Sequence, residues 1–512
     1  MVHLPGGGGT EFAFDVARDA ADGSILVVGL TSSSNFPTPN GYDTTHNGGD
    51  DAFVARLSYD GSDLISATYL GGPQQDWAVN VDLAAASGVT VSGFTNSPVF
   101  PTTPQAYDPF HNGDYDVFVT RLDPSLGGLV FSTFLGGSGA EASAADFPTY
   151  ADRALGGLAV TASGATLVGG LTRSIDFPAT PGAYQTERRG YQDAFVARLS
   201  PGGDALESAT YFGGSSGDGV MDLAIQPSEE IVMSGSTFST DLPTTSGAFD
   251  QSFHGSSGYI DGFVARFDPM VSQLRYSTYL GGTEDDQLFA VAFDELGDVI
   301  VSGCAGVGFP FTSDAYDSTY NGNADAVLVR LRPLGNGAAD LKYGTFLGGN
   351  GRDSAWGLAV PATESILDPV VLGGSTRSPD FPTTPGAVDS THNGGVDAWM
   401  ALLVSVGASD VAEPPVAGPT LAGLRLGPPH PNPSQGAIAF AIDLPSRAFV
   451  RVGIYDASGR LVMELLDREV AYGPHVLSWE PRDLRQKVSP GTYFIRLEAG
   501  GETDSRKVVI GS

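Results

Sequence analysis

The sequence predicts an all-β protein built mainly from one unit that recurs six times. Its most regular stretch is DAFVARL at Asp51–Leu57, and related stretches follow at intervals of 64 to 77 residues. Phe53, Ala55 and Leu57 fall on one face of this stretch, and this period of two indicates a β-strand. A unit of this length is too long for a helical solenoid repeat and suits one blade of a β-propeller. The later copies begin at Asp116, Asp193, Asp261, Asp325 and Asp397.

Each of the first five units contains sequence for four strands. A strand of small apolar residues such as Phe12–Ala17 comes first, and it is expected to lie nearest the propeller axis. The second ends in glycine, as in ILVVG at Ile25–Gly29. A proline-rich loop such as Phe36–Tyr42 is expected to wrap over a blade edge, with its apolar ends in a small satellite cluster. DAFVARL is the third strand. The fourth, as at Ser66–Gly72, ends in paired glycines, which are expected to adopt a positive φ at the crossing between blades.

The sixth unit has no fourth strand after Leu403. Met1–Leu4 stand where such a strand would precede Gly6 and Gly7, so we expect them to pair with Asp397–Leu403, or this outer strand to be missing. Met1–Thr10 shows neither the basic nor the apolar region of a signal peptide. We therefore expect the chain to be an N-terminally shortened version of a longer precursor.

The combined motifs resemble the bacterial β-propeller repeat family labelled SBBP. The motifs are VSG followed by threonine, FPTTPGAY-like loops, DAFVARL and STYLGG, and the resemblance covers residues 1–403. It implies seven blades, whereas this chain has six units. It also implies an extracellular or cell-envelope repeat protein, and it supplies no catalytic residues.

A second domain is predicted after the repeats. Residues 404–424 have the Pro, Gly and Ala composition of a linker. Residues 425–512 contain short alternating strands, as at Ala437–Leu444 and Ala448–Tyr455, which predict a small Ig-like β-sandwich. This segment resembles the C-terminal sorting domains of the bacterial type nine secretion system and the related Ig-like domain of flagellar hook-cap proteins. The motifs that carry the resemblance are PNPS, IYDASGRLV, GPH with a later Trp479, GTYFIRL and RKVVI.

Charge and composition exclude several classes of function. The net charge is −33, and residues 1–424 account for all of it because residues 425–512 are nearly neutral. The surface of residues 1–424 therefore repels nucleic acid and anionic lipid. The single cysteine, Cys304, rules out an internal disulfide and is expected to be a buried small residue. No apolar run is long enough for a transmembrane helix.

Two acidic positions recur in every unit. One leads the third strand, from Asp51 to Asp397. The other follows the double glycine, at Glu11, Asp76, Glu141, Asp218, Asp286 and Asp353. Such carboxylates suit a repeated Ca²⁺ site. The favoured alternative is structural, with each carboxylate accepting backbone N–H bonds at a turn or strand start.

No residue is assigned a catalytic, cofactor-binding or metal-binding role. His46, His111, His254 and His392 share one loop position, but Tyr320 stands there in the fifth unit, and one histidine per blade is too sparse for zinc. Neither a G-x-S-x-G elbow nor an H-E-x-x-H motif occurs.

The sequence therefore predicts a six-bladed propeller of four-stranded blades at 1–403 and a sorting domain at 425–512 that is handled by a secretion translocon. We expect a non-catalytic binding or scaffold protein, extracellular or on the outer-membrane surface, with a protein or glycan as its ligand. The alternatives are a purely structural envelope protein and a glycan-active enzyme that uses paired acids.

Overall fold

The computed structural model describes residues 6–84, 88–141, 156–256, 258–294, 296–360, 369–403, 425–426, 438–444, 448–456, 460–470, 473–479, 488, 491–499 and 502–510. The chain forms two compact units. The first comprises Met1–Val360 and Val370–Leu403, and the second comprises Pro361–Pro369 and Val404–Ser512. The linker expected at 404–424 lies outside the described residues.

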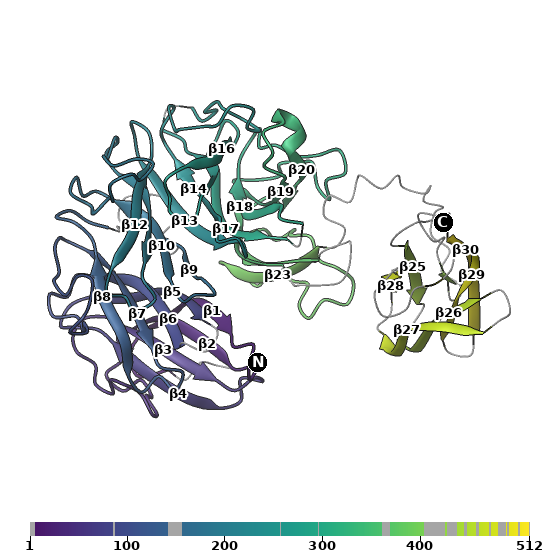
Figure 1. Ribbon diagram of the computed structural model, residues 1–512, viewed down its shortest axis with the longest axis horizontal. Helices are drawn as coiled ribbons and strands as arrows, with labels where there is room; N and C mark the ends of the chain where they lie inside the picture. Colours follow the sequence, from purple (N-terminus) through teal and green to yellow (C-terminus); the bar gives the residue numbers. More distant parts are fainter. Residues whose placement is uncertain are drawn as a thin grey trace. The chain divides into compact units, whose positions relative to one another are not determined.

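Six antiparallel sheets make up the first unit (Figure 1). Each DAFVARL-type stretch is the third strand of a different sheet, which confirms the predicted strand order. The first four sheets are β1 (Glu11–Arg18), β2 (Ile25–Thr31), β3 (Asp51–Leu57) and β4 (Leu64–Leu70); β5 (Asp76–Ala84), β6 (Gly88–Thr95), β7 (Asp116–Leu122) and β8 (Leu129–Leu135); β9 (Leu158–Val160), β10 (Thr166–Thr172), β11 (Asp193–Leu199) and β12 (Leu206–Phe212); and β13 (Asp218–Ile225), β14 (Ile231–Thr237), β15 (Asp261–Phe267) and β16 (Leu274–Leu280).

The fifth sheet is complete, and the sixth has three strands. These two sheets are β17 (Gln287–Phe293), β18 (Val299–Ala305), β19 (Asp325–Leu331) and β20 (Leu341–Leu347), and β21 (Asp353–Ala359), β22 (Val370–Thr376) and β23 (Asp397–Leu403). A single 3₁₀ turn, η1 (Gly337–Asp340), precedes β20.

A glycine in the second strand makes room for the aromatic ring of the third. Gly29 lies opposite Phe53 in the register of β2 and β3, and Gly235 lies opposite Phe263 in β14 and β15. A Cβ added to either glycine would stand 2.8 Å from the ring of its partner. The small residue is therefore required by close approach across the ladder.

Successive sheets pack face to face through their first strands. β5 contacts β2, β13 contacts β10, β17 contacts β14 and β21 contacts β18. These first strands lie toward the middle of the unit (Figure 1), as expected for the small-residue strands. Together the sheets bury a largely apolar core, in which Val54, Phe118 and Phe195 are almost fully inaccessible.

The proline-rich loop contributes to this core and also reaches the next sheet. Phe100 stacks on Phe118 at 4.4 Å between ring centroids, and both belong to a core cluster shared by the first two sheets. The expected satellite cluster is therefore wrong for Phe100, whereas Phe36 of the first loop belongs to a smaller separate cluster with Phe53 and Tyr69. At the other end, the N–H of Tyr42 donates to the carbonyl of Leu126 in the second sheet at 2.8 Å, so the loop does cross a sheet edge.

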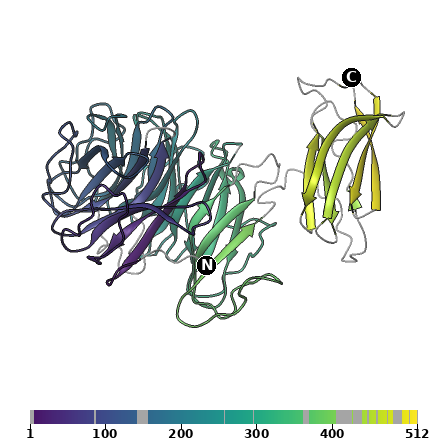
Figure 2. The ribbon, with the colours of Figure 1, turned by 90° about the horizontal axis from the view of Figure 1, so that it is seen from below.

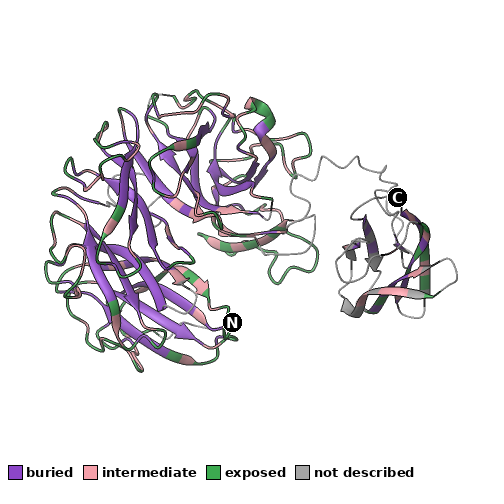
Figure 3. Ribbon diagram, viewed as in Figure 1, coloured by how far each residue is buried: buried purple, intermediate pink, exposed green. Residues whose placement is uncertain are grey.

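The sixth sheet differs from the prediction of four-stranded blades. No fourth strand pairs with β23 within the described part of the unit. Its exposed residues contrast with the buried third strands of the other sheets (Figure 3). Met1–Leu4, which were expected to pair there, lie outside the described residues, and closure of the six sheets into a ring remains a prediction.

The second unit contains two antiparallel sheets in two layers (Figure 2). The predicted alternation is confirmed, because Ile438, Phe440 and Ile442 are buried together with Ile454 and Ile495. The first sheet is β24 (Arg425–Leu426), β25 (Ile438–Leu444) and β28 (Gly473–Trp479). The second is β27 (Leu461–Val470), β26 (Ala448–Asp456), β29 (Gly491–Ala499) and β30 (Glu502–Ile510).

Candidate functional site

The aspartate that leads each third strand holds the loop before it. Asp51 Oδ2 accepts the backbone N–H of Asn47 at 2.7 Å, and the other five leading aspartates make the same bond. This confirms that these carboxylates accept backbone N–H bonds at a strand start. The remaining donors are Asn112 to Asp116, Arg189 to Asp193, His254 to Asp261, Asn321 to Asp325 and Asn393 to Asp397.

The second recurring carboxylate lies at the start of the first strand and receives three donors. Asp76 accepts the N–H of Gly72 at 2.8 Å, the hydroxyl of Thr95 at 2.5 Å and the hydroxyl of Ser97 at 3.0 Å. Asp76 thus links the paired glycines, where the chain crosses between sheets, to the second strand of its own sheet. Glu11, Glu141 and Asp218 repeat this triad with their own Gly, Thr and Ser residues.

The two carboxylates meet at the seam between consecutive sheets, with the first glycine of the pair between them. A Cβ added to Gly71 would lie 2.8 Å from Asp76 Oδ2 and 3.0 Å from Asp51 Oδ1. At Gly281 it would lie 2.9 Å from both Asp261 Oδ1 and Asp286 Oδ2. The glycine is needed because both carboxylates approach it. The positive φ expected for these paired glycines is wrong, since none of them has one in the first five seams.

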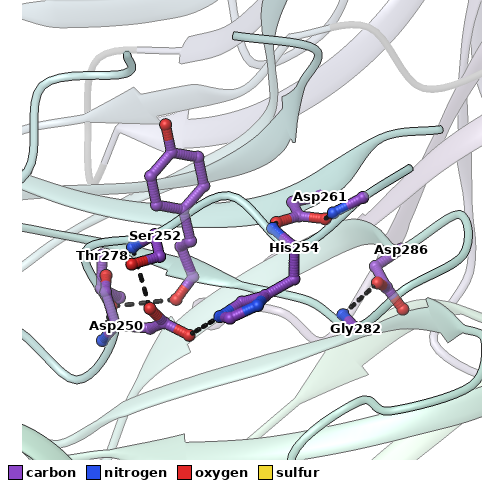
Figure 4. Close-up of polar contacts among 9 residues, drawn as sticks. Asp250, Ser252, His254, Asp261, Thr278, Gly282 and Asp286 are labelled. Carbon is purple, nitrogen blue, oxygen red and sulfur yellow. Dashed lines mark hydrogen bonds and ion pairs between the residues drawn. The ribbon is translucent and has the colours of Figure 1, made fainter. Parts of the chain in front are cut away.

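Burial makes these carboxyl groups hard to ionise. It raises the pKa of Asp51 and of Asp261 to about 6, and that of Glu141, Asp218 and Asp325 to about 7. The neighbouring carboxylate of the seam adds to this increase at Asp51, Glu141, Asp218 and Asp325. In the fourth seam, burial and the Asp261 carboxylate hold the pKa of Asp286 well above its usual range (Figure 4).

The histidine position has a packing role in the first two sheets. The His46 ring lies edge-on to Tyr69 of β4 at 5.8 Å, and the His111 ring lies edge-on to Phe134 of β8 at 5.7 Å. Tyr320 packs against Phe346 at 6.3 Å with the two rings tilted, so a tyrosine can take the same packing position. His254 instead forms a pair with Asp250 at 2.7 Å (Figure 4). Among the described residues, no group of three or more His, Cys, Asp or Glu side chains could hold a metal ion.

Three further acids, which were not singled out from the sequence, connect the first strands of neighbouring sheets across the seams. Asp15 accepts the N–H of Val81, Asp82 accepts that of Val160, and Asp222 accepts that of Val291. Each bond is 2.7–2.8 Å long and joins one sheet to the next. Burial raises the pKa of Asp15 to about 6 and that of Asp222 to about 7. The sequence feature that could have identified these three acids is an acidic residue within a strand of small apolar residues.

The recurring arginine of the third strand was also given no role. Arg56 lies 2.9 Å from Asp19, Arg198 lies 2.8 Å from both Glu207 and Glu229, and Arg330 lies 3.0 Å from Asp298. These buried guanidinium groups anchor the hairpin turns of their own sheets. Cys304 is buried as expected, and burial raises the pKa of its thiol to about 11, so it is a poor nucleophile.

Two hollows open beside the seams of the first three sheets. One, of about 560 Å³, is lined by residues that include Gln74, Asn96, His111, Asp114, Tyr115 and Arg173. The other, of about 470 Å³, is lined by residues that include Tyr42, Asp43, Asn47 and Val99. Both present amide, hydroxyl and ring groups, which suit a polar ligand.

Comparison with known proteins identifies the C-terminal segment. Residues 430–511 match the family described as the secretion system C-terminal sorting domain. The protein is therefore exported by the type IX secretion system and is secreted or located at the cell surface. No curated protein matches the sequence. In the described part of the chain, no helix has the length and apolar character needed to cross a membrane.

Three solved structures are distantly similar to this chain. An acylaminoacyl peptidase in complex with Z-Gly-Gly-Phe-chloromethyl ketone is 9% identical with a TM-score of 0.29, and the alignment covers 85% of this chain but 58% of the peptidase. A lignostilbene dioxygenase from Pseudomonas brassicacearum is 16% identical with a TM-score of 0.30 and 95% of each chain covered. A glycoside hydrolase family 43 arabinoxylan arabinofuranohydrolase from Bacillus subtilis, in complex with cellotetraose, is 11% identical with a TM-score of 0.25, covering 100% of this chain and 97% of that one.

Proposed function

We propose that this protein is an exported, non-catalytic binding scaffold whose first unit presents loops at the cell surface or outside the cell. The proposal rests on the groups that the recurring carboxylates bind. Asp51, Asp76 and their counterparts accept hydrogen bonds from the chain's own backbone and hydroxyl groups. The residues that recur therefore build the sheets, while the loops between them are free to vary.

The two hollows are the proposed ligand sites. Gln74 and Asp114 are exposed at the larger one, and the intermediate burial of Tyr115 leaves part of its ring accessible. Amide, carboxylate and phenol groups can hydrogen-bond to the hydroxyls of a glycan or to an extended peptide. We therefore propose a glycan or peptide ligand at this position.

Binding is tested with the full chain on a glycan array and a peptide library. Gln74→Ala combined with Asp114→Ala should weaken a captured ligand at least tenfold, whereas the exposed control Gln251→Ala should leave its affinity unchanged. Equal affinity for both variants would contradict the proposed position. Incubation with labelled polysaccharide separates the alternatives, because turnover would show an enzyme instead of a binding protein.

Export through the second unit is a separate prediction. The full chain and a chain lacking residues 425–512 would be expressed behind a working signal peptide in a host with a type IX system. The sorting-domain match predicts that the truncated chain stays in the periplasm. Unchanged appearance of the truncated chain at the cell surface would contradict an export role for this unit.

A further inference from the structure

Within the part of the chain that the structure describes, three of the seams contain a buried carboxylate oxygen with no hydrogen-bond donor. These atoms are the Oδ1 atoms of Asp51, Asp116 and Asp325, and all three residues have 0% of their surface exposed. Each Oδ1 faces the first glycine of the pair at its seam. That glycine also contacts the second carboxylate of the seam or lies beside it. In the fifth seam the Oδ1 atom of Asp353 on the facing strand is unpartnered as well.

In the third and fourth seams, the Oδ1 atom of the corresponding aspartate does have a hydrogen-bond donor. Asp193 Oδ1 accepts the N–H of Gly190 at 2.8 Å, and its Oδ2 accepts the side-chain amide of Gln185 at 2.8 Å. Asp261 Oδ1 accepts the N–H of Gly255 at 2.9 Å. The loops of these two units therefore deliver a second donor that the other three loops do not deliver.

Two ionised carboxylates cannot share such a buried place without strong repulsion. A buried acceptor without a donor also carries the cost of its lost hydration. A proton on Oδ1 removes the repulsion between the two charges and turns the unpaired acceptor into a donor. In the second seam Asp116 and Glu141 lie within side-chain hydrogen-bonding reach of each other. A cation fits less well, because Asp76 and Glu141 are already surrounded by N–H and O–H donors whose positive ends would oppose it.

We propose that the carboxyl pairs Asp51–Asp76, Asp116–Glu141 and Asp325–Asp353 each hold one shared proton at neutral pH, so that these seams between sheets are proton-dependent contacts. The first unit then contains a pH-sensitive device at three defined seams. Its sheets are held together more firmly in acid than in alkali.

The groups around each pair set the size of the effect. Asp51 is faced by His46, Asp43 and Asp76, and Asp116 by His111, Asp108 and Glu141. A charged imidazole favours the ionised carboxylate and so works against the shared proton. Asp325 is faced by Asp317, Asp353 and Asp380, with Tyr320 in place of histidine. Of these three seams, the fifth should therefore show the largest response to pH.

The sign of the pH dependence follows from the direction of the shift. The folded chain holds these protons up to a higher pH than the unfolded chain, whose carboxyl groups titrate at about 4. Stability is therefore fully present below about pH 4, falls as the pH rises through the folded pKa of about 7 for Asp325, and is constant above it.

The test compares Asp325→Asn with Asp193→Asn in the full chain, because an asparagine amide reproduces a protonated carboxyl. Hydrogen exchange of β19 and β11, corrected for the intrinsic rate, would be measured at pH 5 and pH 8.5. Wild-type β19 should lose protection at pH 8.5, and Asp325→Asn should abolish at least half of that loss. Asp193→Asn should weaken β11 at both pH values, since its amide would face the donors from Gly190 and Arg189.

A second measurement keeps the proposal testable if a variant does not fold. The infrared band of protonated carboxyl groups should be present in the wild type at pH 7 and should weaken in Asp325→Asn. Absence of this band in the wild type would overturn the proposal. So would equal effects of Asp325→Asn and Asp193→Asn, or a rise in β19 protection on adding Ca²⁺ at pH 8.5, which would indicate a cation instead of a proton.

Discussion

The fifth and sixth sheets carry the same motif in two different surroundings. Every residue of β19 (DAVLVRL) is buried, because β20 pairs with it and β21 packs against its sheet. β23 (DAWMALL) alternates between partly buried and exposed residues, with Met400 82% exposed and Leu402 64% exposed. The motif by itself therefore forms a strand, but the strand is buried only where a neighbouring sheet and a fourth strand cover it.

The largest expected effect comes from removing the aromatic ring of the third strand. Phe263→Ala in a complete sheet should lower the free energy of unfolding of the first unit by about 3–5 kcal/mol, because the ring is fully buried. Trp399→Ala at the matching position of the sixth sheet should cost roughly 1–2 kcal/mol, because part of that ring already meets solvent. Hydrogen exchange of β15 and β22 would measure both. Equal losses would contradict the comparison.

A smaller effect is expected from glycine substitutions in the same two sheets. A Cβ on Gly281 would stand 2.8–2.9 Å from the Asp261 and Asp286 carboxyl groups, so Gly281→Ala should cost about 1–3 kcal/mol. Gly373 in β22 has no atom within 4 Å of such a Cβ, and Gly373→Ala should change stability by less than about 0.5 kcal/mol. Chemical denaturation of the two variants would check this. A tolerated Gly281→Ala would show that the seam is looser than the geometry indicates.

The smallest effect should follow from changing the exposed face of β23. Met400→Ser removes a side chain that lies mostly in solvent, so the free energy of unfolding should change by less than about 0.5 kcal/mol. The same denaturation experiment measures it. A loss of more than about 1 kcal/mol would indicate that another surface covers β23 in solution.

The sequence predicted the strands better than it predicted the seams. Period-two alternation identified the third strand of all six sheets, and recurrence singled out the positions of Asp51 and Asp76 as two repeated acids. It could not reveal that Asp51 and Asp76 lie on consecutive sheets and meet at Gly71, because that contact depends on how one sheet packs on the next. For the same reason the glycine was assigned a backbone role, when its lack of a side chain is what the site requires.

The acids that join first strands were missed for a related reason. Asp15 and Asp222 have no regular counterpart in every unit, since alanine stands at the matching position in the fifth sheet, as Ala290. Repetition was the main signal in this sequence, and residues that do not repeat give no such signal. Their bonds to Val81 and Val291 become visible only when neighbouring sheets are in place.

The central claim is that the recurring carboxylates bind the chain's own backbone and not a ligand. Its most direct test is the free energy of unfolding of Asp193→Ala, with and without Ca²⁺. Removal of this acceptor leaves the N–H groups of Arg189 and Gly190 without a partner, so stability should fall by about 1–3 kcal/mol and Ca²⁺ should not restore it. A wild-type melting temperature that falls on adding a chelator would contradict the claim and favour a bound metal ion.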